Sequence, residues 1–187
     1  MHRYEATRGR QVVTLEEGAM IGKFDDFQFD IRTWRIFGYR LKPLHVFGRA
    51  GGVAAEDLDK VGRDVVFIRA ESQVVWSGAA RNPEEGRAWA SRYLGSKVLS
   101  RDGTALGTVG DLMFDDATHA LCGLILSDGR LVLLDERVST GPAAVVLEDD
   151  RCAVPLLDPQ ENEDPDHWWA RMEEASRLGR SGPTQDA

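Results

Sequence analysis

The stretch ALGTVGDLMFDDATHALCGLIL, residues 105–126, decides the fold, because the chain contains a second, diverged copy of it. Moved back by 85 residues, it falls without a gap on MIGKFDDFQFDIRTWRIFGYRL, residues 20–41. Identical pairs in this region include Val13/Val98, Gly18/Gly103, Gly22/Gly107, Asp26/Asp111, Phe29/Phe114, Asp30/Asp115, Gly38/Gly123 and Leu41/Leu126. An internal repeat of this length sets the architecture, so we expect two copies of one unit.

Each copy has the pattern of short β-strands. In the second copy the strand SKVLS meets the turn signal RDG, and a longer alternating strand follows. Glycine inside a strand marks a bulge or bend, and Gly22 and Gly107 hold the same place in the two copies. Short strands bent at glycines predict a small closed or nearly closed barrel. A later match, Gly62 with Gly141, is offset by 79 residues, which places about six extra residues of the first copy in RLKPLHVFGRAGG.

Two segments outside the repeat have helical patterns. NPEEGRAWASRY predicts a short linker helix over residues 83–93. EDPDHWWARMEEASRLG predicts a C-terminal helix that Asp164 caps, Pro165 begins and Gly179 ends. We expect Trp168 or Trp169 of this helix to be buried, either within the chain or in a symmetric homodimer.

The charge distribution predicts where that helix docks. Residues 148–187 hold four Lys/Arg and eleven Asp/Glu, whereas residues 1–50 hold nine and six. Opposite charges favour docking of the helix on the first copy or on the contact zone between the copies.

The predicted fold is therefore mainly β, with two tandem barrels, a short linker helix and a C-terminal helix. The expected organisation is a first barrel at 1–78, a linker helix at 79–93, a second barrel at 94–157, and an acidic helix and tail at 158–187.

Composition narrows the class of protein. The 187 residues carry a net charge of −8, which is unfavourable for strong non-specific nucleic-acid binding. No apolar run approaches the length of about 18–20 residues that spans a bilayer, and the N-terminus lacks a secretory pattern, so we expect no membrane insertion. Two cysteines are too few for a disulfide framework, and we expect a cytoplasmic protein.

The repeat resembles the PRC-barrel family. The second copy has Leu106, Gly107, Val109, Asp111 and Asp115 in the family's "LG.V.D…D" pattern. The first copy has the corresponding residues Ile21, Gly22, Phe24, Asp26 and Asp30. This family includes the barrel of the photosynthetic reaction centre H subunit and that of the ribosome maturation factor RimM. The resemblance implies a small β-barrel that binds another macromolecule, and it covers roughly residues 9–76 and 94–155.

The polar residues of the quoted stretch have two interpretations. Asp111, Asp115, Asp116 and His119 combine carboxylates with an imidazole, as a metal site does. However, His119 aligns with Trp34, so a metal site would be present in one copy only. We favour a scaffold role in which the aspartates cap turns, and we expect no metal, no cofactor and no catalytic residues.

A basic and aromatic segment, residues 32–49, is the strongest candidate for a binding surface. With the tryptophans of the C-terminal helix, the candidate partner-binding residues are Arg32, Trp34, Arg35, Tyr39, Arg40, Lys42, Trp168 and Trp169. Arginine and aromatic residues are enriched at protein interfaces and also bind RNA by charge and stacking. The alternative is that the aromatics belong to the core and the basic residues to its solvated rim.

These observations predict a non-enzymatic binding or adaptor protein with a protein partner. The alternative is an RNA- or ribosome-associated maturation factor, which the acidic net charge disfavours.

Overall fold

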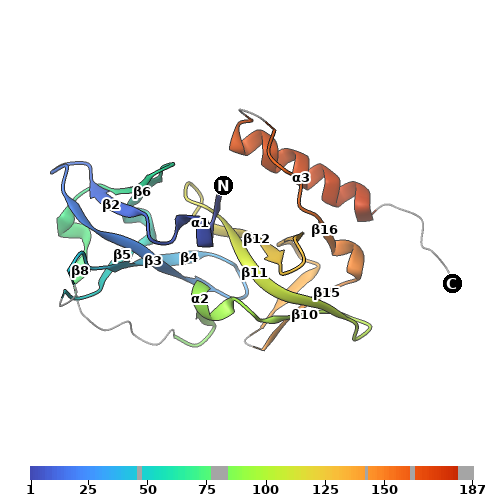
Figure 1. Cartoon of the computed structure of the whole chain (residues 1–187). Coiled ribbons are helices and arrows are strands. Elements are labelled where there is room, and N and C mark those ends of the chain that lie inside the picture. The colour runs from blue at the N-terminus through green and yellow to red at the C-terminus, as the bar shows by residue number, and fades with distance from the viewer. Residues whose placement is uncertain (46–47, 77–83, 142, 161–162, 181–187) are drawn as a thin grey trace.

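The computed structural model describes residues 1–45, 48–76, 84–141, 143–160 and 163–180. The chain is mainly β and forms two curled sheets that lie side by side (Figure 1). The first sheet has the strand order β6 (Leu58–Val61), β7 (Val65–Ile68), β2 (Gln11–Thr14), β3 (Met20–Asp30), β4 (Ile36–Lys42), β5 (Gly51–Ala54) and β8 (Val75–Trp76). The second has the order β14 (Val138–Thr140), β15 (Ala144–Leu147), β10 (Lys97–Ser100), β11 (Ala105–Asp115), β12 (Ala120–Leu126), β13 (Arg130–Leu133) and β16 (Ala153–Pro155).

The two sheets therefore have the same connectivity, strand for strand. In both, the neighbours along the sheet are antiparallel except for one parallel pair, β2 with β7 and β10 with β15. The short 3-10 turns Ala55–Asp57, Glu71–Gln73 and Asp150–Cys152 connect strands at the sheet ends. The sequence repeat thus folds twice into one topology.

The register corrects one detail of the sequence alignment. Val12 pairs with Gly22, and Val98 pairs with Gly107, so Val12 and not Val13 is the counterpart of Val98. The hairpin between β2 and β3 is one residue longer than the hairpin between β10 and β11. In the first, the Thr14 amide donates to the Ala19 carbonyl, whereas in the second the Ser100 amide donates to the Thr104 carbonyl. The offset between the copies is consequently 86 residues before this turn and 85 after it.

Short segments precede each sheet and cross to the other one. The first arm comprises β1 (His2–Arg3) and α1 (Tyr4–Thr7), and β1 pairs with Met113 and Phe114 of β11. The second arm comprises β9 (Arg87–Trp89) and α2 (Ala90–Tyr93), and β9 pairs with residues 28–30 of β3.

The predicted linker helix is wrong over most of its described length. Residues 87–89 form a strand, and the helix is a single turn at Ala90–Tyr93, while residues 79–83 lie outside the described residues. The capping pattern was outweighed by strand pairing with β3, which a local motif does not reveal.

One hydrophobic core runs through both sheets. Phe27 of β3 contacts Phe114 of β11 with ring centres 5.2 Å apart, and Phe24 stacks on the same ring at 6.3 Å. Tyr4 of the first arm is fully buried and lies edge-on to Phe27. The arms and the aromatic residues of β3 and β11 thus close a single interior between the sheets.

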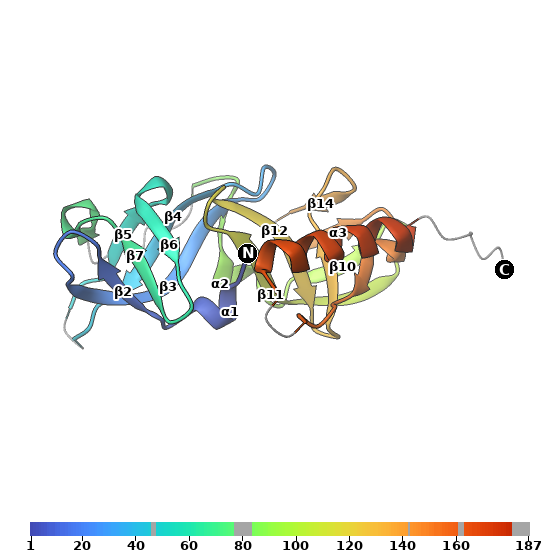
Figure 2. The same ribbon diagram turned by 90° about the horizontal axis from the view of Figure 1, so that it is seen from above.

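The helix α3 (Pro165–Arg180) covers the outer face of the second sheet (Figure 2). Asp164 caps it by accepting a hydrogen bond from the Asp166 amide at 2.9 Å, as predicted, and the helix continues one residue beyond Gly179. Trp168 is 8% exposed, which confirms the burial of a tryptophan within the chain, and its indole N–H donates to the Leu157 carbonyl.

The expected docking of α3 on the first copy or on the contact zone is wrong. The helix packs on an apolar patch of the second sheet formed by Met113, Ile125, Leu131 and Val154. An aromatic side chain buries about 150–250 Å² at roughly 25 cal/mol per Å², which exceeds what solvent-screened surface charges contribute. Apolar complementarity therefore decided the docking site.

Substitution of Gly107 tests the bend in β11. Its φ of +133° lies in a region that side chains with a Cβ rarely adopt. We expect Gly107→Val to lower the free energy of unfolding by about 1 kcal/mol or more in chemical denaturation. Thr108→Val, on the same strand without positive φ, is the control and should have a smaller effect; equal losses would exclude backbone strain as the reason for the glycine.

Removal of the Trp168 side chain tests the docking of α3. Trp168→Ala should cost about 3 kcal/mol, because it empties a buried aromatic site between helix and sheet. Leu178, on the same helix, is 67% exposed, so Leu178→Ala should change stability by no more than about 0.5 kcal/mol. Thermal unfolding followed by circular dichroism measures both, and similar melting temperatures for the two variants would contradict the docked helix.

Candidate functional site

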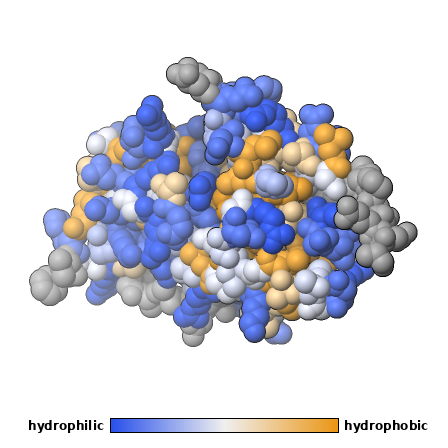
Figure 3. Space-filling model, turned by 45° about the vertical axis from the view of Figure 1, so that its right-hand side comes forward, coloured by the Kyte–Doolittle hydropathy of each residue, from blue (hydrophilic) through white to orange (hydrophobic). Residues whose placement is uncertain are grey.

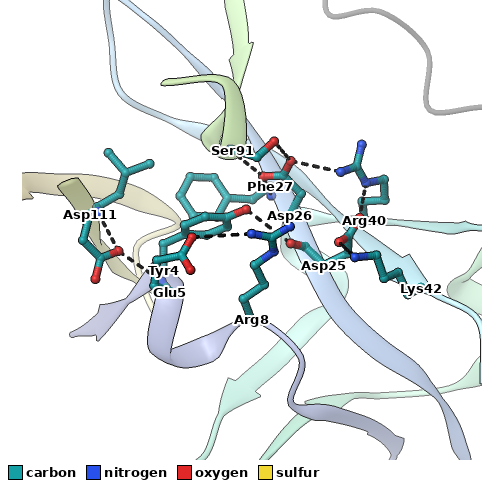
Figure 4. A network of polar contacts seen from close by, with 11 residues as sticks. Tyr4, Glu5, Arg8, Asp25, Asp26, Phe27, Arg40, Lys42, Ser91 and Asp111 are labelled. Carbon is teal, nitrogen blue, oxygen red and sulfur yellow. Dashed lines mark hydrogen bonds and ion pairs between the residues drawn. The ribbon is translucent and has the colours of Figure 1, made fainter. Parts of the chain in front are cut away.

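The two aspartates of the repeated motif bind the arm that crosses from the other half (Figure 4). The Asp111 carboxylate accepts hydrogen bonds from the Glu5 amide at 3.0 Å and from the Leu112 amide at 2.8 Å. Asp26 accepts from the Ser91 amide at 3.1 Å and from the Phe27 amide at 2.9 Å. Glu5 and Ser91 are the second residues of α1 and α2, so each carboxylate caps the one-turn helix of an arm.

Additional side chains reinforce each cap. The Arg3 guanidinium donates to Asp111 at 2.9 Å, and the Ser91 hydroxyl donates to Asp26 at 2.5 Å. Asp111 is 3% exposed and Asp26 is fully buried. These carboxylates are therefore positioned by donors from both halves of the molecule and serve as structural anchors.

The second motif aspartate in each copy caps a turn, as predicted. Asp30 accepts from the Arg32 and Thr33 amides, both at 2.8 Å, and Asp115 accepts from the Ala117 amide at 2.8 Å. Each turn ends in a residue with positive φ, Trp34 at 59° and His119 at 51°. We refer to residues 30–35 and 115–120 as the first and second motif turns.

The motif turns join the two sheets symmetrically. The Ile36 amide donates to the His119 carbonyl, and the Leu121 amide donates to the Trp34 carbonyl, both at 2.8 Å. Arg35 and Ala120 form a β-bridge between these two bonds. The two hydrogen bonds are equivalent to each other under the repeat, and Arg35 and Ala120 are equivalent positions, so the contact zone has a local pseudo-twofold axis. We call this zone the seam.

Each motif turn also binds the outer strand of the other sheet. The Asp116 carboxylate accepts from the Val61 amide of β6 at 2.7 Å and from His2 Nε2 at 2.8 Å. On the other side, the Thr140 hydroxyl of β14 donates to the Ile31 carbonyl. Burial alone would raise the pKa of Asp116, but the hydrogen bonds from His2 and Val61 outweigh it and hold the pKa far below its usual range.

These partners explain why the acidic residues do not converge. Asp111 faces an arm, Asp115 caps its own turn, and Asp116 faces β6. The His119 ring instead lies 3.3 Å from the Tyr39 hydroxyl. The four side chains lie close together in the sequence but bind separate partners, and Asp115, Asp116 and His119 lie at the seam.

A cleft of about 600 Å³ opens beside the seam. Thr33 and Trp34 of the first motif turn line it, together with Trp169 and Glu173 of α3 and Leu134 beyond β13. In the view of Figure 3, hydrophobic surface gathers in patches that hydrophilic residues interrupt. The cleft is therefore built by both halves and by the C-terminal helix, and its lining mixes apolar and aromatic side chains with charged ones.

Cys122 also lines the cleft, on β12. Burial, followed by the nearby Asp115 charge, raises the pKa of its thiol to about 11. The thiol donates to the Ala120 carbonyl at 3.4 Å and is protonated at neutral pH, which is the unreactive form of cysteine. It contributes polarizable surface to the cleft.

The structure distributes the candidate partner-binding residues over several places. Tyr39 is 2% exposed and belongs to the core, and burial raises its pKa above the ordinary value. Arg32 and Arg35 are exposed on the first motif turn. Trp34 is half-buried, donates to the Thr140 hydroxyl at 3.1 Å and lines the cleft.

Two basic candidates are engaged in ion pairs. Arg40 contacts Asp25 at 2.6 Å and Asp26 at 3.1 Å, and its guanidinium lies 4.6 Å from the ring centre of Trp89. Lys42 pairs with Asp25 at 2.7 Å. Trp168 is buried between α3 and the second sheet, whereas Trp169 is partly exposed at the cleft. Of the predicted set, Trp34 and Trp169 are thus brought to one site, and the others are not.

Sequence reasoning missed the two arms and their caps. A fixed offset of 85 residues hides them, because an 86-residue offset is needed to align Gly9 with Gly95, both of which have positive φ. Each of these glycines lies two residues after a one-turn helix. The pair is the signal that identifies the arms as part of the repeat.

Residues 88–155 match the family model for the PRC-barrel domain. The match begins in the second arm and ends at the last residue of β16, so it contains β10 to β16 of the second sheet but not β1. No curated protein matches the chain. Among the described residues, no helix has the length and apolar character needed to cross a bilayer.

The pH dependence of stability tests the Asp116 contact. Because its folded pKa lies below the unfolded value of about 3.9, the carboxylate stabilises the fold above about pH 4, and this stabilisation is lost as the pH falls. We expect Asp116→Asn to cost about 1 kcal/mol at pH 7 and progressively less below pH 4. Urea unfolding at a series of pH values measures this, and a pH-independent difference would contradict the assignment.

Proposed function

We propose that the protein is a cytoplasmic, non-enzymatic adaptor that binds a protein partner in the cleft beside the seam. The observation that carries this proposal is the composition of the cleft, which combines Trp34, Trp169 and Leu134 with charged residues. Aromatic side chains at the centre of a concave surface are typical hot spots of protein interfaces.

We further propose that the first copy is a second barrel of the PRC type. Its support is the identical strand order of the two sheets and the equivalent capping by Asp26 and Asp111. The family match to the second copy supports a binding role in general. In a tandem arrangement, the cleft is the place where one partner contacts both barrels at once.

The charges near the cleft favour a protein over RNA. The net charge is −8, and Asp115, Asp135 and Glu173 line the cleft beside Arg137 and Arg177. Arg40 and Lys42, two basic members of the candidate partner-binding set, are paired with Asp25. A ribosome-associated role therefore has less support than a protein partner.

Capture of partners with cleft variants tests the proposal. Thr118 is exposed and lines the cleft, whereas Thr104 is exposed at the opposite end of β11. With C-terminally tagged protein, we expect Thr118→Arg to reduce the recovered partner by about tenfold, because a bulky side chain occupies the cleft; Thr104→Arg should retain it. The partner should remain after nuclease treatment.

Three results would each contradict the proposal. Loss of the partner with nuclease would indicate RNA, and equal recovery with both arginine variants would place binding elsewhere. A site-specific photocrosslinker at Thr118 that captures nothing, while one at Thr104 does, would also exclude the cleft.

A further inference from the structure

The two arms are exchanged between the halves of the molecule. The first arm precedes the first sheet in the sequence but pairs with β11 of the second sheet. The second arm precedes the second sheet but pairs with β3 of the first. The longest strand of each sheet thus pairs with a short strand that comes from the other half.

The chemistry of the two exchanges is the same. Each arm presents two or three extended residues, followed by a one-turn helix whose second amide donates to a buried aspartate of the opposite sheet. Each arm also buries an aromatic side chain in the common core: Tyr4 lies 5.5 Å from the ring centre of Phe27, and Tyr93 lies 5.4 Å from that of Phe29.

The seam adds further contacts that do not involve the covalent connection. The two amide–carbonyl bonds at Trp34 and His119 and the Asp116–Val61 bond all cross between the halves. The Phe27–Phe114 contact crosses as well. Together with the arms, these contacts form a desolvated interface of hydrogen bonds around an aromatic centre, as found in stable protein dimers.

We propose that each half carries a docking surface for the arm of another half of the same type, and that the two halves associate without the covalent linker between them. The chain is a heterodimer of two related units in one polypeptide. The partner that fits each surface has an extended segment, a one-turn helix with a free second amide, and an aromatic residue at that helix. This inference does not depend on the proposed adaptor role.

Cleavage of the intact protein between the halves tests this directly. A specific protease site introduced at residues 77–83, between β8 and the second arm, leaves both arms and both sheets in the folded chain. With a C-terminal tag on the second half, we expect the first half to be retained after cleavage at about 1 μM. Light scattering should give the mass of the full chain, and the circular dichroism spectrum should stay unchanged.

Exchange of halves tests the docking surface as a site for a separate molecule. Cleaved tagged protein is mixed with cleaved untagged protein that carries an isotope label, and the tag is captured over time. We expect labelled first halves to appear on the tagged second halves. Separation or unfolding of the halves on cleavage would overturn the proposal. If no exchange is seen on mixing, the mixture is partially denatured and refolded, and a lack of exchange after that step would also overturn it.

Matched variants of Glu5 assign the association to the arm cap. Glu5→Pro removes the amide that donates to Asp111, whereas Glu5→Ala keeps it. We expect the dissociation constant of the cleaved halves to rise at least about tenfold with Glu5→Pro and to stay within about twofold with Glu5→Ala. Asp111→Ala should weaken association as Glu5→Pro does, whereas Asp102→Ala, which alters a turn cap within the second half, should not. Equal dissociation constants for the two Glu5 variants would overturn the role of the arm.

Discussion

The structure depends on a carboxylate that caps a helix from the opposite half. In each half, an aspartate that is identical in both copies, Asp26 or Asp111, lies within the longest strand. Its carboxylate accepts a hydrogen bond from a backbone amide of an arm. A buried carboxylate without donors is strongly destabilising, so the sheet requires the arm and the arm requires the sheet. This mutual requirement gives a physical reason for the identity of Asp26 and Asp111 in the two copies. It also fixes the relative orientation of the two sheets, because each arm is only a few residues from its own sheet.

Once the sheets are fixed in this way, the rest of the seam follows. The motif turns meet around the pseudo-twofold axis, and their positive-φ residues direct two carbonyl groups toward amides of the opposite strand. The symmetry is broken by side chains: Asp116 reaches β6 from one turn, whereas a backbone carbonyl accepts from Thr140 at the other. Trp34 replaces His119 at the equivalent position and points to the side of α3. The cleft between Trp34 and Trp169 is therefore a product of divergence within a symmetric scaffold.

The outer faces of the two sheets diverged as well. Positions 113, 125 and 131 hold Met, Ile and Leu in the second sheet and pack under α3. The equivalent positions of the first sheet are Gln28, Arg40 and Gly52. A single amphipathic helix can cover only one of these faces, and it covers the apolar one in spite of the charge distribution. Electrostatic steering acts over the whole chain but weakly, whereas apolar burial depends on the local contact.

The sequence by itself determined the repeat, the mainly β character, the turn caps at Asp30 and Asp115 and the capped C-terminal helix with a buried tryptophan. These features rest on hydrophobic period, turn chemistry and capping, which act over a few residues. Only the tertiary structure decided the strand at 87–89, the docking face of α3, the burial of Tyr39, and the exchange of the arms. The amide that Asp26 caps is 65 residues away in the chain, and the amide that Asp111 caps is 106 residues away. No local pattern encodes such a pair, because the partner is a backbone amide, which every residue except proline supplies.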